Sequence, residues 1–193
     1  MKRVCVFCGS NEGIRPIYRE AARTLGEALV RQGMELVFGG GRVGLMGVLA
    51  NAVLAARGRA IGVIPEALVA KELAHQGLSE LRVVGSMHQR KALMAELSDA
   101  FLALPGGFGT LEEYCEVLTW AQLGLHAKPC GLLNVAGFYD ALLDLFDHAV
   151  SEQFVPGPHR LLVLVEEDPQ RLLNLLGGYR PPQVEKWIDP LES

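Results

Sequence analysis

Short apolar runs alternate with amphipathic stretches along the whole chain of 193 residues. The runs are four or five residues long and occupy residues 4–8, 35–38, 60–64, 81–84, 100–104, 129–133 and 161–165. Between them, apolar residues recur every three or four positions, which is typical of amphipathic helices. These stretches cover residues 14–29, 45–57, 87–98, 109–124, 138–151 and 169–176. The pattern predicts strands and helices in alternation.

This order of elements predicts an α/β fold with a parallel sheet of about seven strands. The strands are almost wholly apolar instead of alternating, so we expect helices on both faces of the sheet. A chain of this length, half of it apolar, can bury one substantial core, so residues 1–178 are predicted to form a single domain. Residues 179–193 contain three prolines and no regular period, which indicates a C-terminal tail.

Charge and hydropathy narrow the class of ligand. The net charge is -4, and Lys and Arg are scattered singly or in pairs, which argues against nucleic-acid binding. No run of about 18 apolar residues and no signal-peptide pattern is present. We therefore expect a cytoplasmic protein that does not contact membranes and that binds a small molecule.

The cysteines and histidines do not form a metal motif. Cys5 and Cys8 lie three positions apart in a predicted strand, where their side chains point to opposite faces. Buried, reduced thiols are therefore favoured over a zinc or redox pair. The five histidines lack the spacing of metal ligands, so we expect no metal site.

A first glycine-rich segment, Gly39-Gly-Gly-Arg-Val-Gly44, follows the predicted strand at 35–38. It satisfies G-x-G-x-x-G, the phosphate-binding pattern of dinucleotide folds. A dinucleotide fold has a carboxylate at the end of the next strand. Here that residue is Glu66, which follows a proline, and this argues against a dehydrogenase. Two interpretations of Gly39, Gly40 and Gly41 stay open: a secondary loop for phosphate or ribose, and a tight strand-to-helix turn.

A second glycine-rich segment, Pro105-Gly-Gly-Phe-Gly-Thr-Leu-Glu-Glu113, links a predicted strand to the next helix. Its glycines let the backbone approach a ligand, and the helix start favours an anion such as phosphate. Thr110 can add a hydroxyl group. Bound anions gain nothing from a nearby negative charge, so Glu112 or Glu113 is either a surface residue that offsets the helix dipole or a group with a chemical role.

Further polar residues follow on the same helix and on the one before it. Glu112, Glu116 and Thr119 align at i+3 and i+4 spacing, and solvent exposure is favoured for the two acids. Arg90 lies beside an apolar stripe, so it either extends to water or directs its guanidinium at a phosphate or carboxylate of the site. Lys91 is expected to be solvated or to make a secondary contact with an anion.

Several segments together resemble the LONELY GUY family of cytokinin-activating nucleoside 5′-monophosphate phosphoribohydrolases. They are Cys8-Gly-Ser10, Gly39-Gly-Gly41, Met87-His-Gln-Arg-Lys91, residues 105–113 and Thr119-Trp-Ala-Gln-Leu-Gly124. The resemblance runs from about Val4 to Val165, and P-G-G-x-G-T-x-x-E is matched at every fixed position. It implies a Rossmann-like, doubly wound fold, a homodimer or an oligomer of dimers, and no cofactor. The implied reaction hydrolyses the N-glycosidic bond of AMP or an N6-modified AMP, giving free base and ribose 5-phosphate.

The same resemblance implies the roles of individual residues. Arg90 and Glu113 match the catalytic pair, and the charge of Arg90 is expected to keep Glu113 ionised. Substrate binding is implied for Glu72, Arg90, Lys91, Gly107, Phe108, Gly109, Thr110, Leu111, Glu112, Glu113 and Thr119. The rival hypothesis from another class is a nucleotide or cofactor carrier that has this fold without catalysis. A pyridoxal-phosphate decarboxylase is disfavoured, because none of the five lysines lies in a convincing cofactor context.

Overall fold

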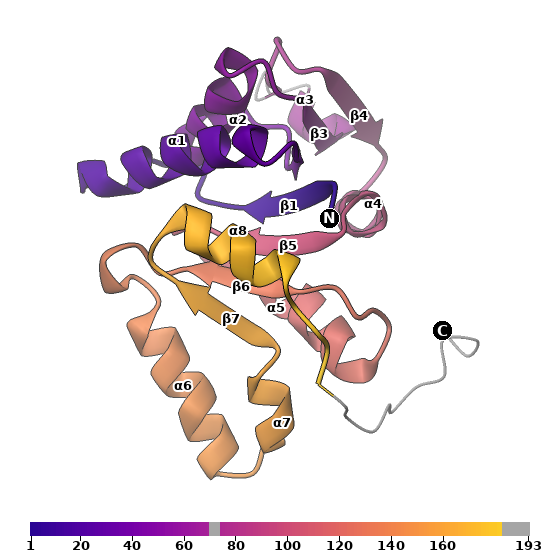
Figure 1. Ribbon diagram of the computed structural model, residues 1–193. Coiled ribbons are helices and arrows are strands. Elements are labelled where there is room, and N and C mark those ends of the chain that lie inside the picture. The colour runs from indigo at the N-terminus through magenta and orange to yellow at the C-terminus, as the bar shows by residue number, and fades with distance from the viewer. Residues whose placement is uncertain (70–73, 183–193) are drawn as a thin grey trace.

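The computed structural model describes residues 1–69 and 74–182. Seven strands form one parallel sheet in the order β4-β3-β2-β1-β5-β6-β7. Figure 1 shows this sheet from β4 at the top to β7 near the bottom. Their bounds are β1 (Arg3–Phe7), β2 (Glu35–Phe38), β3 (Ala60–Pro65), β4 (Glu80–Val84), β5 (Ala100–Ala103), β6 (Cys130–Leu133) and β7 (Val163–Glu166). The predicted parallel sheet of about seven strands is confirmed.

The six predicted helices are all present. They are α1 (Pro16–Arg31), α2 (Gly44–Ala55), α4 (Met87–Leu97), α5 (Phe108–Leu123), α6 (Asp140–Ser151) and α8 (Pro169–Gly177). Three further elements are α3 (Glu66–Val69), the 3₁₀ helix η1 (Val135–Gly137) and α7 (Gly157–Arg160). Each of these spans only three or four residues, which is too short for a helical period to be visible in the sequence.

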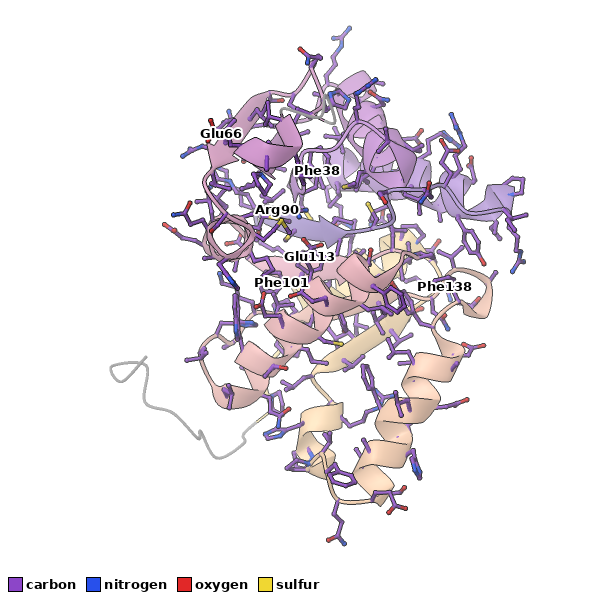
Figure 2. All side chains as sticks on the ribbon, turned by 180° about the vertical axis from the view of Figure 1, so that it is seen from behind. Phe38, Glu66, Arg90, Phe101, Glu113 and Phe138 are labelled. Carbon is purple, nitrogen blue, oxygen red and sulfur yellow. The ribbon has the colours of Figure 1, made fainter. Side chains whose placement is uncertain are left out.

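The helices cover both faces of the sheet, as expected. Successive residues of β1 contribute to two separate cores, with Val4 and Val6 in one and Cys5 and Phe7 in the other. The first core is completed by α1, α2 and α8, and the second by α4, α5 and α6. Figures 1 and 2 show these two faces from opposite sides.

β4 departs from the expectation that every strand is covered on both faces. Leu81, Arg82 and Val83 are all exposed. This strand lies at the edge of the sheet and pairs with β3 on one side. Leu81, Val83 and Val84 led to its prediction as a covered strand, although Arg82 is a charge in the middle of the strand that the central strands lack.

The strand order places a topological switch point between β1 and β5. From β1 the chain moves outward through β2 and β3 to β4, and it then returns to β5 on the other side. Ligands of such sheets bind where the order reverses, outside the carboxyl ends of the strands. Backbone hydrogen bonds join the two loops there, from Gly9 N to Pro105 O at 3.1 Å and from Leu104 N to Phe7 O at 2.9 Å.

Candidate active site

A pocket of about 250 Å³ opens at this switch point. The loop after β1 contributes Cys8 and Ser10, and helices α2 and α4 contribute Met46, Met87 and Arg90. The turn before α5 and the helix itself contribute Gly107, Phe108, Gly109, Thr110, Glu112 and Glu113. A second pocket of about 230 Å³ shares Ser10 and Gly107 with it. A larger hollow of about 700 Å³ between α1 and α2 contains none of the predicted site residues that the structure describes.

The turn before α5 exposes backbone N–H groups to the pocket. Gly107 is the N-cap, and among the described residues no side chain caps the helix, so the first N–H groups lack helical partners. A Cβ added at Gly106 would lie 2.1 Å from Thr110 Oγ1, so this glycine makes room for the buried threonine. A Cβ added at Gly107 or Gly109 would meet no described atom within 4 Å. Two of the three glycines therefore leave space that a ligand can occupy.

Arg90 of α4 and Glu113 of α5 form a buried ion pair in the pocket. Arg90 Nη2 lies 3.1 Å from Glu113 Oε1, and the two side chains are only 11% and 10% exposed. Figure 2 shows both side chains between the two helices. Arg90 Nε also donates a hydrogen bond to the carbonyl of Val63, at 3.2 Å. The interpretation that Arg90 extends to water is wrong, and the one that directs it at a carboxylate is confirmed.

The environment of Glu113 acts on its carboxyl in two directions. Burial raises the pKa of Glu113 above its ordinary value, and the charge of Arg90 opposes that rise. Glu112 and Glu116 raise the pKa further, whereas Lys91 lowers it. The net direction is upward, and Arg90 acts against it, so the ionised state of Glu113 stays a prediction. The 3.1 Å contact between Oε1 of Glu113 and Arg90 is an ion pair without hydrogen-bond geometry, so Oε1 has no hydrogen-bond partner among the described residues.

A second charged cluster joins α4 to α5 beside this pair. The ammonium of Lys91 donates to Glu112 and, at 2.9 Å, to Glu116 Oε1. The hydrogen bond to Glu112 is the main reason that the pKa of Lys91 is raised. The prediction that Lys91 and Glu116 are exposed to solvent is therefore wrong. Glu112 is exposed as predicted, but it is paired with Lys91. The spacing within one helix could not reveal this cluster, because its partners come from two helices.

Three predicted binding residues lie elsewhere or outside the described structure. Thr119 is exposed about 10 Å along the helix from Glu112, and its hydroxyl donates to the carbonyl of Cys115 at 2.7 Å. Leu111 packs against the core beneath α5. Glu72 lies outside the described residues. The described pocket lining does not include Thr119 or Leu111, and substrate binding by these three residues stays a prediction.

The first glycine-rich turn, residues 39–44, contacts protein instead of open space. A Cβ on Gly39 would lie 2.0 Å from Arg90 Nη2. Gly40 has a positive φ of +72°, and its carbonyl accepts a hydrogen bond from His75 N at 2.9 Å. Gly41 forms an isolated bridge with Ala74. None of these glycines belongs to the described lining of the pocket, so the loop for phosphate or ribose stays a prediction.

Similarity to known proteins agrees with this geometry. The family model described as "Possible lysine decarboxylase" matches residues 46–176. A protein of Oryza sativa subsp. japonica, "Probable cytokinin riboside 5'-monophosphate phosphoribohydrolase LOGL9", is 55% identical over 180 residues, which are 93% of this chain and 79% of the relative. "Cytokinin riboside 5'-monophosphate phosphoribohydrolase LOG7" of Arabidopsis thaliana is 49% identical over 93% of this chain and 83% of its own. The chain belongs to the LONELY GUY family.

Solved structures share the fold of this family member at much lower identity. The molybdenum cofactor binding protein from Rippkaea orientalis has a TM-score of 0.68 at 22% identity and covers 92% of this chain and 96% of its own. The molybdenum cofactor carrier protein from Chlamydomonas reinhardtii also has a TM-score of 0.68, at 20% identity, over 91% of this chain and 96% of its own. These likenesses concern the fold, and they confirm its Rossmann-like class.

The pocket of this LONELY GUY family member also contains residues for which the sequence predicted no functional role. Cys8 and Ser10 line the pocket because they follow β1 at the switch point, a position that the strand order could have revealed. Burial raises the pKa of the Cys8 thiol, and the charge of Glu113 acts in the same direction, so the thiol stays neutral. Met46 and Met87 also line the pocket, and their spacing gave no signal of it.

Proposed function

We propose that this protein hydrolyses the N-glycosidic bond of purine nucleoside 5′-monophosphates, either AMP or N6-modified AMP. The products are the free base and ribose 5-phosphate. The observation that carries the proposal is the buried pair of Arg90 and Glu113 beside the open turn at Gly107 and Gly109. Two relatives that are 49% and 55% identical over most of the chain are named for the same reaction, which supports the proposal.

The open turn supplies the groups that an anionic substrate requires. The N–H groups of Gly107, Phe108 and Gly109 and the hydroxyl of Thr110 bind the 5′-phosphate in this proposal. The positive end of the α5 dipole favours the bound charge. Binding at the phosphate, which does not react, fixes the ribose relative to the carboxylate and so contributes to the rate.

Glu113 is placed to act on the ribose. Breaking the C1′–N9 bond leaves its electron pair on the base and builds positive charge on the sugar, as in other glycosidic cleavage. A carboxylate near C1′ stabilises that charge more in the transition state than in the ground state. Glu113 also accepts a proton from the water whose oxygen bonds to C1′, and this proton then passes to the departing base, directly or through solvent, so that Glu113 is ionised again and one water is consumed. Arg90 orients the carboxylate and favours its charged form.

The test is an assay of purified protein with AMP that measures adenine and ribose 5-phosphate together. We expect equal amounts of the two products, and a loss of at least about 100-fold in kcat for Glu113→Gln and a large loss for Arg90→Ala. Glu152→Gln, at an exposed acid after α6, is the matched control and should keep the wild-type rate. No adenine above background, or full activity of Glu113→Gln, would contradict the proposal.

The carrier hypothesis makes the opposite prediction for the same sample. Two structural neighbours are named as molybdenum cofactor binding or carrier proteins, but at 20% to 22% identity the likeness supports only a shared fold. The relatives at about 50% identity favour hydrolysis. A carrier would hold AMP intact for hours without releasing adenine, whereas the proposed enzyme releases both products.

We further propose that the protein works in the cytoplasm as a homodimer or an assembly of dimers. None of the described helices is long and apolar enough to cross a membrane. Light scattering coupled to gel filtration should give an even multiple of the 20.9 kDa chain mass. A monomer throughout the concentration range of the activity assay would contradict the proposed assembly.

A further inference from the structure

The guanidinium of Arg90 lies directly against the backbone of Gly39, which follows the end of β2. A Cβ built on Gly39 would lie 2.0 Å from Arg90 Nη2 and 3.1 Å from Cζ. Real Cβ atoms do not approach other heavy atoms within 3.0 Å, so the two groups cannot occupy their present positions together. Gly39 is not among the residues with positive φ, so its backbone conformation is open to other residues. A side chain at this position would therefore meet the guanidinium of Arg90, the end of a flexible side chain, which would have to move.

Groups on the other sides of the guanidinium complete its surroundings. Arg90 Nε donates to the carbonyl of Val63 in β3, at 3.2 Å. Nη2 faces Glu113 Oε1 at 3.1 Å, and Nη1 lies 3.7 Å from the sulfur of Met87. A displaced guanidinium must therefore lose at least one of these contacts. Movement away from residue 39 changes its position relative to Glu113, which determines the geometry of the pair.

We propose that Gly39 is a positioning residue for the reaction, because its missing side chain provides the space in which Arg90 meets Glu113. The inference rests on the proposed function, in which this pair acts on the ribose. It assigns to the first glycine of residues 39–44 a role through Arg90 instead of direct contact with the substrate. The N–H groups of residues 107–110 would be unaffected by a change at this position, since Gly39 is not part of that turn.

A double-mutant cycle tests whether Gly39 acts through Arg90. We expect Gly39→Ala to lower kcat by about 100-fold, the scale of a 1 Å misplacement, with a smaller change in KM. In the Arg90→Ala background the same substitution should change kcat by less than about threefold, because independence would require the effects to multiply. Without the guanidinium, the nearest remaining atom is Met46 Sδ at 3.4 Å, an ordinary contact. Unchanged kcat in Gly39→Ala, or losses that multiply in the double variant, would overturn the inference.

A spectroscopic readout separates this contact from a general effect on folding. The Nε–H of Arg90 is buried and hydrogen-bonded, so its nitrogen–proton NMR signal should exchange slowly with water; loss of that signal in Arg90→Lys assigns it. Gly39→Ala should shift the signal and speed its exchange. Gly177→Ala, where an added Cβ meets no described atom within 4 Å, should leave it unchanged. An unaltered Arg90 signal in Gly39→Ala would contradict the inference.

The two measurements distinguish failure of the inference from failure of the proposed function. If wild-type protein releases no adenine, the proposed reaction is wrong, but the NMR comparison still decides whether Gly39 sets the position of Arg90. If Arg90→Ala is impaired while Gly39→Ala keeps both the wild-type rate and the wild-type signal, the reaction stands and the positioning role is wrong.

Discussion

The two glycine-rich turns of this protein look alike in sequence but differ in what surrounds them. Each follows a buried strand and precedes a helix of the Rossmann-like sheet. In the turn at residues 39–44, the glycines are placed against Arg90, Ser10 and the segment that begins at Ala74. In the turn at residues 105–109, Gly107 and Gly109 have no described neighbour where a side chain would be.

A glycine motif therefore shows where another group must come close to the backbone, but not which group it is. At Gly39 the approaching group is a side chain of the protein, and at Gly107 and Gly109 the space contains no described atom. A phosphate requires free N–H groups and accessible backbone, and the second turn supplies both. Substitutions in the first turn should therefore affect folding or Arg90, and those in the second should affect substrate binding.

The largest effect is expected at Gly44, in the first turn. Its φ is +61°, and an added Cβ would lie 2.2 Å from the carbonyl carbon of Ser10 and 2.4 Å from Asn11 N. Both contacts are with backbone, which cannot rotate away, so Gly44→Ala should lower the free energy of unfolding by about 3 kcal/mol or more. Urea unfolding measures this difference. A variant as stable as the wild type would show that this turn is not tightly packed.

Gly109→Ala, in the second turn, should give the reverse pattern. The added methyl meets no described atom, so the free energy of unfolding should change by no more than about 1 kcal/mol, the usual helix-propensity difference between the two residues. The methyl would enter the proposed phosphate site, and we expect the Kd for AMP to rise about tenfold, equal to about 1.4 kcal/mol. Calorimetric titration of AMP measures the Kd, with Glu113→Gln present in both proteins so that the nucleotide is not cleaved. An unchanged Kd would place the phosphate away from this turn.

The pH dependence tests the environment of Glu113 beside the second turn. Burial raises its pKa, so the proton is retained at higher pH than by an ordinary glutamate with a pKa of about 4.3. The carboxylate is the active form, so kcat/KM should fall as pH decreases through that raised value. The acidic limb of the profile, which reports the free enzyme, should therefore lie above pH 4.3. A limb at or below the ordinary value would contradict the raised pKa of this carboxyl.

The smallest effect is expected at Glu112, which neighbours Glu113 but pairs with Lys91. The side chain of Glu112 is 54% exposed, and partly exposed pairs contribute no more than about 1 kcal/mol. Glu112→Gln should lower kcat by less than about fivefold and stability by less than about 1 kcal/mol. Steady-state kinetics beside Glu113→Gln measures the difference. A larger loss for Glu112→Gln than for Glu113→Gln would exchange the roles of the two acids.

The sequence was sufficient for the architecture because the strands and the helices have clearly different apolar patterns. The strands of the sheet are short apolar runs, and the helices between them repeat every three to four residues. The exposure of Leu81 and Val83 in β4 was missed, because position in the sheet, not composition, makes this an edge strand.

The sequence was less informative about the site, because its decisive contacts join different elements. Resemblance to the family selected Arg90 and Glu113, but only the structure places their charged groups 3.1 Å apart. The spacing along α5 grouped Thr119 with Glu112, yet Thr119 contacts its own helix backbone. The contact of Gly39 with Arg90 brings together a residue just after β2 and a residue of α4 that no local pattern connects.

The most direct test of the account is the structure of Glu113→Gln with AMP bound, since this variant should bind the nucleotide without cleaving it. We expect the 5′-phosphate to bind to the N–H groups of residues 107–110, with C1′ of the ribose facing residue 113. A phosphate bound on the turn at residues 39–41, or a ribose directed away from residue 113, would contradict it.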